Sequence, residues 1–270
     1  MSKPTILRII IATVFVTLFV ACTYLGGIPF LLFLMVLALI SINELYNMMR
    51  VRNFLPAYYI GNFFTVFFLI FSYYALKKNW EPAHSAIFTG AAIVTMIATL
   101  FLKRGKEATI DTALTLMGII YVGWFYSYCI FVQALTPRGE YFLYVGATLL
   151  IVDSAAYLIG KKFGKTKLFP LVSPKKTIEG ALAGFVSGIV FGLLCAYFTN
   201  QPIFHFVIMG ILMGILAQLG DLFESLIKRD AGVKNSSNIL PEHGGILDRI
   251  DSYTFTVPIL YYYLVWFVVK

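Results

Sequence analysis

Charged residues are scarce in this sequence, at 13% of its 270 residues, which is about half the share usual in soluble globular proteins. Hydrophobic residues make up 60%, and the mean hydropathy is +0.84. A water-soluble protein of this size could not bury that much apolar surface in one core. The composition therefore excludes a soluble domain, and it also excludes a disordered chain, which needs low hydrophobicity.

Cysteine is also scarce, with three residues that all lie within apolar stretches: Cys22, Cys129 and Cys195. An odd number without metal-ligand spacing excludes a disulfide framework and predicts small buried side chains. Alternating apolar and polar residues are missing as well, which excludes a transmembrane β-barrel.

Long apolar runs are abundant instead. A transmembrane helix needs about 20 mostly apolar residues. Nine stretches approach or reach that length: 9–25, 28–48, 57–76, 83–102, 112–134, 141–160, 178–199, 203–228 and 250–269. The sequence thus predicts an all-α polytopic integral membrane protein with about nine transmembrane helices. The first stretch could mimic a secretory signal, but Gly26 and Gly27 predict a tight turn into the second, which favours a retained helix.

Basic residues indicate how these spans are oriented. With nine spans, 17 of the 21 Lys and Arg residues fall on the side of the N-terminus and four on the other side. The positive-inside rule then places the N-terminus in the cytoplasm and the C-terminus outside. We expect a multi-pass protein of the cell (inner) membrane.

Acidic residues divide the chain. Residues 1–138 contain four, all near predicted span ends, whereas residues 139–270 contain nine, several of them inside helices. We therefore expect residues 1–138 (spans 1–5) to act as scaffold and residues 139–270 (spans 6–9) to be catalytic. Glycine recurs at every fourth position of span 7, at Gly180, Gly184, Gly188 and Gly192. Such a stripe predicts a close packing seam, within the chain or between the subunits of a homodimer.

Three predicted helices bring acids to a similar depth near the cytoplasmic face. Span 8 carries a polar stripe at helical spacing: Asp221, Glu224, Ser225 and Lys228. Span 9 begins with Asp248 and Asp251, and Asp153 lies in span 6. Acids within spans cost free energy, so they indicate function. Carboxylates are hard oxygen ligands, which suit Mg²⁺.

Ordinary ion pairs are the alternative, with Asp221, Asp248 and Asp251 neutralised by basic neighbours: Lys228, Arg229 and Arg249. Six more lysines lie between spans 6 and 7: Lys161, Lys162, Lys165, Lys167, Lys175 and Lys176. A solvated loop that attracts anionic lipid would explain these lysines alone. A loop that holds phosphates beside a metal ion explains the lysines and the acids together.

The loop between spans 8 and 9 contains His243, Gly244 and Gly245. Paired glycines let backbone N–H groups approach an anion. The histidine fits a general base, a phosphate donor or a structural hydrogen bond. Asp248 follows near a helix N-terminus, whose dipole also favours negative charge.

Three segments resemble the phosphatidate cytidylyltransferases, also called CDP-diacylglycerol synthases. The first covers about 27 positions, residues 225–251, and ends in PEHGGILDRID. The others are residues 153–164 and 173–180, so the resemblance covers the chain from about 150 to 252. Two positions depart from the family pattern: Asn235 stands where Asp is usual, and Glu242 where Gly is usual.

The resemblance implies a membrane nucleotidyltransferase that converts CTP and phosphatidate to CDP-diacylglycerol and pyrophosphate. Phosphatidate is a membrane lipid and would enter the site from the inner leaflet. It implies that Asp221 and Asp248 hold Mg²⁺, assisted by Asp251, with a second metal ion as an option. Lys175 and Lys176 would grip the triphosphate.

The resemblance also implies that Lys228, Arg229 and Arg249 hold the lipid phosphate or the pyrophosphate, with Lys228 and Arg249 counted among the catalytic residues. The further substrate-binding residues that it implies are Asp153, Ser173, His243, Gly244 and Gly245. No nucleic-acid partner is expected.

Two alternatives are an ion-coupled transporter and a related CTP-dependent enzyme that acts on another lipid phosphate. Transporters often place their sites at the midplane between repeated halves. Here the acids cluster at one face and in one half, which disfavours transport. Only the resemblance of residues 225–251 to the family disfavours an enzyme that acts on another lipid phosphate.

Overall fold

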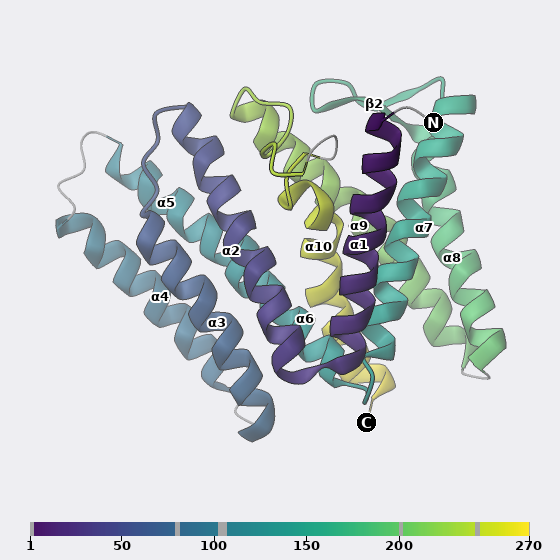
Figure 1. The fold of residues 1–270 in the computed structure, drawn as a ribbon, viewed down its shortest axis with the longest axis horizontal. Helices are drawn as coiled ribbons and strands as arrows, with labels where there is room; N and C mark the ends of the chain where they lie inside the picture. Colours follow the sequence, from purple (N-terminus) through teal and green to yellow (C-terminus); the bar gives the residue numbers. More distant parts are fainter. Residues whose placement is uncertain (1–2, 79–81, 102–106, 200–201, 241–243, 270) are drawn as a thin grey trace. The chain divides into compact units, whose positions relative to one another are not determined.

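The computed structural model describes residues 3–78, 82–101, 107–199, 202–240 and 244–269. Within these residues the fold is almost entirely helical, with one two-stranded sheet (Figure 1). The chain forms two compact units. The first comprises Met1–Glu140 and Asp230–Arg249, and the second comprises Tyr141–Arg229 and Ile250–Lys270.

The first unit is built mainly from the N-terminal helices, which are α1 (Lys3–Leu25), α2 (Gly27–Val51), α3 (Tyr58–Lys78), α4 (Pro82–Phe101), α5 (Ala108–Gly118) and α6 (Phe125–Ala134). A π-helical segment, Ile119–Trp124, joins α5 to α6. Gly26 and Gly27 have positive φ angles of 61° and 55°, which glycine adopts at low cost. The predicted tight turn between the first two helices is confirmed.

Tyr46 of α2 is fully buried within the first unit. Its ring occupies the space that side chains would need at Gly61 of α3 and Gly118 of α5. Its hydroxyl donates to the carbonyl oxygen of Thr115 at 2.8 Å. This hydrogen bond offsets the cost of burying the hydroxyl, so one side chain ties three helices together.

The second unit contains most of α7 (Glu140–Phe163), α9 (Ile203–Asp230) and α10 (Leu247–Tyr263), together with α8 (Ile178–Thr199) and the π-helical turn Leu264–Val268. Strands β1 (Lys167–Phe169) and β2 (Ser173–Thr177) form an antiparallel hairpin between α7 and α8. The sequence predicted this basic segment only as a loop.

The glycine repeat of α8 forms a packing seam within the chain. A Cβ at Gly188 would lie 2.8 Å from the carbonyl oxygen of Gly210 in α9, and one at Gly184 would lie 3.1 Å from that of Val152 in α7. The helix backbones therefore approach at distances that leave no room for a side chain. The seam that the sequence predicted is confirmed here inside the second unit.

Six helices in the described part of the chain are long and apolar enough to cross a membrane: Gly27–Val51, Tyr58–Leu76, Ala108–Ala134, Glu140–Phe163, Ile178–Thr199 and Ile203–Asp230. They coincide with six of the nine predicted spans and indicate a multi-pass membrane protein. Two shorter apolar helices, Ile10–Leu25 and Ser85–Phe101, coincide with the predicted first and fourth spans. The predicted ninth span corresponds to α10, which contains Pro258, and its π-helical turn.

Candidate functional site

The polar stripe predicted for residues 221–228 lies in the last turns of α9. Glu224 is fully buried, and Asp221 is partly exposed. Lys228 forms an ion pair with Glu224 one turn away. Ser225 Oγ donates a hydrogen bond to Asp221 Oδ1 at 3.4 Å. The helical period thus gathers two acids and one lysine on a single helix face, as predicted.

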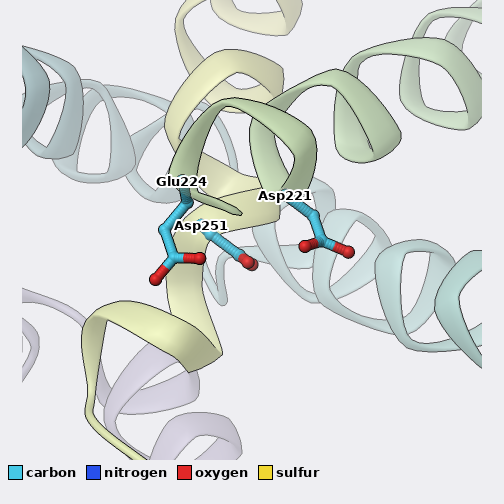
Figure 2. A group of neighbouring side chains, drawn as sticks. All are labelled: Asp221, Glu224 and Asp251. Carbon is cyan, nitrogen blue, oxygen red and sulfur yellow. The ribbon is translucent and has the colours of Figure 1, made fainter. Parts of the chain in front are cut away.

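A third carboxylate joins this stripe from α10. One oxygen each from Asp221, Glu224 and Asp251 lies within 4.8 Å of the other two. Figure 2 shows Asp221 and Glu224 on neighbouring turns of α9, with Asp251 between them in this view. Oxygens bound to one Mg²⁺ at about 2.1 Å are at most about 4.2 Å apart, so a small side-chain rotation would let all three share an ion. The donor set fits a hard divalent cation.

Lys176 of β2 reaches the same acid cluster. Its Nζ lies 2.6 Å from Asp221 Oδ2, and the two side chains are 26% and 32% exposed. A partly exposed ion pair contributes little net stability, because water competes for both charges. Separating this pair therefore costs little free energy when a metal ion takes the place of Lys176 beside Asp221 and a phosphate takes the place of Asp221 beside Lys176.

The hairpin presents its lysines differently. Lys175 is exposed and Lys176 is half-buried, because successive residues of a strand point to opposite sides. Ser173, at the start of β2, is half-buried. Arg229, at the end of α9, donates from Nε to the carbonyl oxygen of Val172 at 3.1 Å. Predicted as a ligand for phosphate, Arg229 in this structure fastens the hairpin to α9.

Asp153 lies on α7 and is exposed. It is close enough to Asp251 for the two charges to interact. The structure therefore places Asp153 beside the acid cluster, outside the group of three carboxylates that could share one ion.

Asp248 belongs to the first unit and is hydrogen-bonded to the signature loop, defined here as the described residues 231–240 and 244–246. Its Oδ2 accepts hydrogen bonds from the backbone N–H groups of Gly245 and Ser236 at 2.8 and 3.0 Å, and from Ser236 Oγ at 2.9 Å. Gly244 has a φ of 82°, a conformation that disfavours any other residue. Arg249 is exposed, and His243 lies outside the described residues.

Sequence reasoning missed one acid that contacts this loop. Glu44 of α2 is 2% exposed, and its carboxylate accepts hydrogen bonds from the hydroxyls of Ser236 and Ser237. From the sequence it is only one of four acids near predicted span ends. Its place within the apolar run 28–48 was the available signal, because a charge there needs partners.

Sequence reasoning also recognised Glu224 as part of the polar stripe but did not assign it as a metal ligand. The structure places its carboxylate among the three that could share an ion. The signal was its position one turn after Asp221 on the same helix face.

Comparisons with known proteins cover both units. The chain matches the model of the cytidylyltransferase family over residues 6–267. It is 34% identical over 263 residues to a phosphatidate cytidylyltransferase of Staphylococcus aureus, covering 94% of this chain and 96% of the relative.

Proteins of the same name from two other bacteria are similar. The one from Staphylococcus haemolyticus is 32% identical over 255 residues, covering 94% of this chain and 96% of the relative. The one from Bacillus subtilis is 31% identical over 264 residues, with 96% and 97% covered. Since both the family model and these relatives span almost the whole chain, the protein belongs to the cytidylyltransferase family of enzymes.

Proposed function

We propose that this protein is a membrane-embedded phosphatidate cytidylyltransferase, which converts CTP and phosphatidate to CDP-diacylglycerol and pyrophosphate in phospholipid biosynthesis. Relatives with that name support the substrates. The observation that carries the chemistry is the group of three carboxylates, Asp221, Glu224 and Asp251, with Lys176 beside it. Such a site has ligands for a cation and a lysine for a phosphate in one place.

The proposed reaction needs no strong general base. A phosphate oxygen of phosphatidate attacks the α-phosphorus of CTP, the bond from that phosphorus to the bridging oxygen breaks, and pyrophosphate leaves with the electron pair. The nucleophile is already ionised at neutral pH. Positioning and charge neutralisation must therefore supply most of the rate.

Mg²⁺ is the proposed cofactor. Asp221, Glu224 and Asp251 are proposed to hold it, and Asp248, three residues before Asp251 in the sequence, is retained as a ligand from the sequence argument. Bound there, the ion would neutralise charge on the phosphates, and the carboxylates leave a second ion as an option.

The basic residues are proposed to bind different phosphate groups. Lys176 would leave Asp221 and bind the triphosphate of CTP, with Lys175 as a second contact. Lys228, Arg229 and Arg249 are proposed for the lipid phosphate or the pyrophosphate. Further substrate contacts are proposed from the sequence alone at Asp153, Ser173, His243, Gly244 and Gly245.

The proposed topology has nine spans with the N-terminus in the cytoplasm and the C-terminus outside, in the cell (inner) membrane. The six long helices, the two shorter apolar helices and α10 with its π-helical turn supply that number. The site then faces cytoplasmic CTP, and phosphatidate enters from the inner leaflet. A homodimer stays a prediction.

The first test is turnover in detergent with labelled CTP, phosphatidate and Mg²⁺, scored for a lipid-soluble nucleotide. Asp221→Asn and Asp248→Asn should each lower turnover about 100-fold or more, since each removes a charge aimed at the reacting groups. Asp230→Asn, at an exposed position, is the matched control and should retain activity.

Near-normal rates in both variants would exclude the metal role. No product from the wild-type protein with phosphatidate would exclude the proposed function. Product formed only with another lipid phosphate would favour the related enzyme instead.

A further inference from the structure

The signature loop is held by an acid from the opposite end of the sequence. Glu44 lies in α2, and its carboxylate meets four donors: Ser236 Oγ at 3.0 Å, Ser237 Oγ at 2.5 Å, the N–H of Ile246 at 3.1 Å and the N–H of Leu247 at 2.8 Å. All of these residues belong to the first unit. The acid and the loop therefore form one local structure.

Three of these donors face Glu44, and the Ser236 hydroxyl is shared with Asp248, so together they match what an ionised carboxylate can accept. Its two oxygens offer about four lone-pair sites and donate nothing. The donors are two hydroxyls and two backbone N–H groups, so none brings a charge of its own. The negative charge of Glu44 is therefore stabilised by hydrogen bonds from the loop, which makes the loop's shape depend on that charge.

Two of the donors lie at the start of α10. The first N–H groups of a helix have no partner within the helix, and negative charge is favourable near that end. The N–H groups of Ile246 and Leu247 donate to Glu44. Glu44 thus caps α10 from another helix and fixes the point at which α10 begins.

The same contacts reach Asp248 through one hydroxyl. Ser236 Oγ lies 3.0 Å from Glu44 Oε2 and 2.9 Å from Asp248 Oδ2, so its single hydroxyl hydrogen is shared between the two carboxylates. Gly245, which donates to Asp248, fits so closely that a Cβ there would lie 2.6 Å from the carboxyl carbon of Glu44. The groups that orient Asp248 are therefore themselves placed by Glu44.

We propose that Glu44 is a positioning residue for the signature loop. Its carboxylate sets the start of α10 and the orientation of Asp248. Transfer of the cytidylyl group therefore depends on an acid in residues 1–138, the half of the chain that the sequence predicts to be scaffold. The structural part of this inference stands alone, and its catalytic part rests on the proposed function.

The test compares Glu44→Gln with two control variants. The amide has nearly the same size, but it turns an N–H donor group toward donors and removes the charge. Glu140→Gln changes an exposed carboxylate that accepts a hydrogen bond from the backbone N–H of Arg138. Tyr46→Phe, in the same helix α2, removes one buried hydrogen bond that lies outside the loop.

Two quantities are measured in detergent. Hydrogen exchange of the peptide covering residues 235–247 should be at least tenfold faster in Glu44→Gln, with exchange in α3 unchanged. At a temperature well below unfolding, kcat should fall about 30-fold, while both controls keep wild-type exchange in the loop and wild-type kcat.

A milder variant protects the test against a Glu44→Gln protein that does not fold. Ser237→Ala removes one of the four donors and should raise loop exchange and lower kcat by smaller factors. In a double-mutant cycle, Ser237→Ala should have almost no further effect once Glu44→Gln is present.

The outcomes are distinguishable. Wild-type exchange and kcat in Glu44→Gln, or additive effects in the cycle, would overturn the positioning role. A fall in kcat matched by Tyr46→Phe at equal loss of thermal stability would reduce Glu44 to a structural role. If the wild-type protein made no CDP-diacylglycerol, the proposed function would fail, while the exchange measurement would still decide the structural part.

Discussion

The two units hold their acids with different kinds of partner. In the first unit, hydroxyls and backbone N–H groups donate to Glu44 and Asp248. In the second unit, Asp221 and Glu224 form ion pairs with lysines, Lys176 and Lys228. Both arrangements satisfy carboxylates in an apolar protein, and the ion pairs of the second unit place flexible, positively charged side chains beside the acids.

The difference indicates which acids can change partners. Backbone donors cannot leave without changing the chain's path, so the acids of the first unit are fixed by the fold. A lysine has a flexible side chain, and the partly exposed pair of Lys176 and Asp221 gains little net stability from staying together. The pair of Lys228 and the buried Glu224 costs more to separate. We therefore expect the first unit to supply fixed geometry and the second to supply the groups that exchange partners when ligands bind.

The largest expected effect tests that exchange in the second unit. Lys176→Met should lower kcat/KM for CTP about 100-fold, equivalent to about 2.7 kcal/mol, because it removes the lysine next to the acid cluster. Lys175→Met, at the exposed neighbouring position, is the matched variant and should cost tenfold or less. Steady-state kinetics with varied CTP measure both. Equal losses would mean that the two lysines bind the triphosphate alike.

The next effect concerns how tightly helices approach. At Gly210 a Cβ would lie 2.5 Å from the carbonyl oxygen of Gly188, whereas at Gly90 of α4 nothing lies within 4 Å. Gly210→Ala should therefore lower stability by about 2 kcal/mol through overpacking. Gly90→Ala should be neutral or raise stability by up to about 1 kcal/mol, because alanine favours helix.

The thermal unfolding temperature in detergent should fall in Gly210→Ala and stay the same or rise in Gly90→Ala. An unchanged or raised unfolding temperature in Gly210→Ala would show that the α8–α9 seam has room to relax.

The smallest effect tests the first unit's role in geometry. Tyr46→Phe deletes the hydrogen bond to Thr115 and should lower the free energy of unfolding by about 1 kcal/mol. Because the hydrogen bond of Tyr46 goes to Thr115 and its ring packs at Gly61 and Gly118, kcat and KM should stay at wild-type values. Chemical denaturation and turnover on the same preparation check this. A change in kcat would mean that the first unit transmits packing to the site.

Much of the site in the second unit could be predicted from helical spacing. The stripe from Asp221 to Lys228 and the nearby Asp251 follow from a 3.6-residue period and from acids placed at similar depths. Pairing between Lys176 and Asp221 could not be predicted, because it depends on the hairpin turning one of two adjacent lysines toward α9.

Glu44 could not be assigned from spacing at all. Its hydrogen bond to Ser236 joins residues 192 positions apart, and no local pattern encodes such a contact. Six of the nine predicted spans could be identified because length and apolarity are local properties. The ninth span is harder to assign, because α10 begins with polar residues and contains Pro258.

The contact between α2 and the signature loop limits how the protein can be cut. A fragment beginning at residue 139 would retain every aspartate and lysine that the sequence assigns to the reaction. It would still lack the carboxylate that accepts hydrogen bonds from Ser236, Ser237, Ile246 and Leu247. Work on the isolated C-terminal half would have to provide the N-terminal helices in trans, as a separately encoded polypeptide.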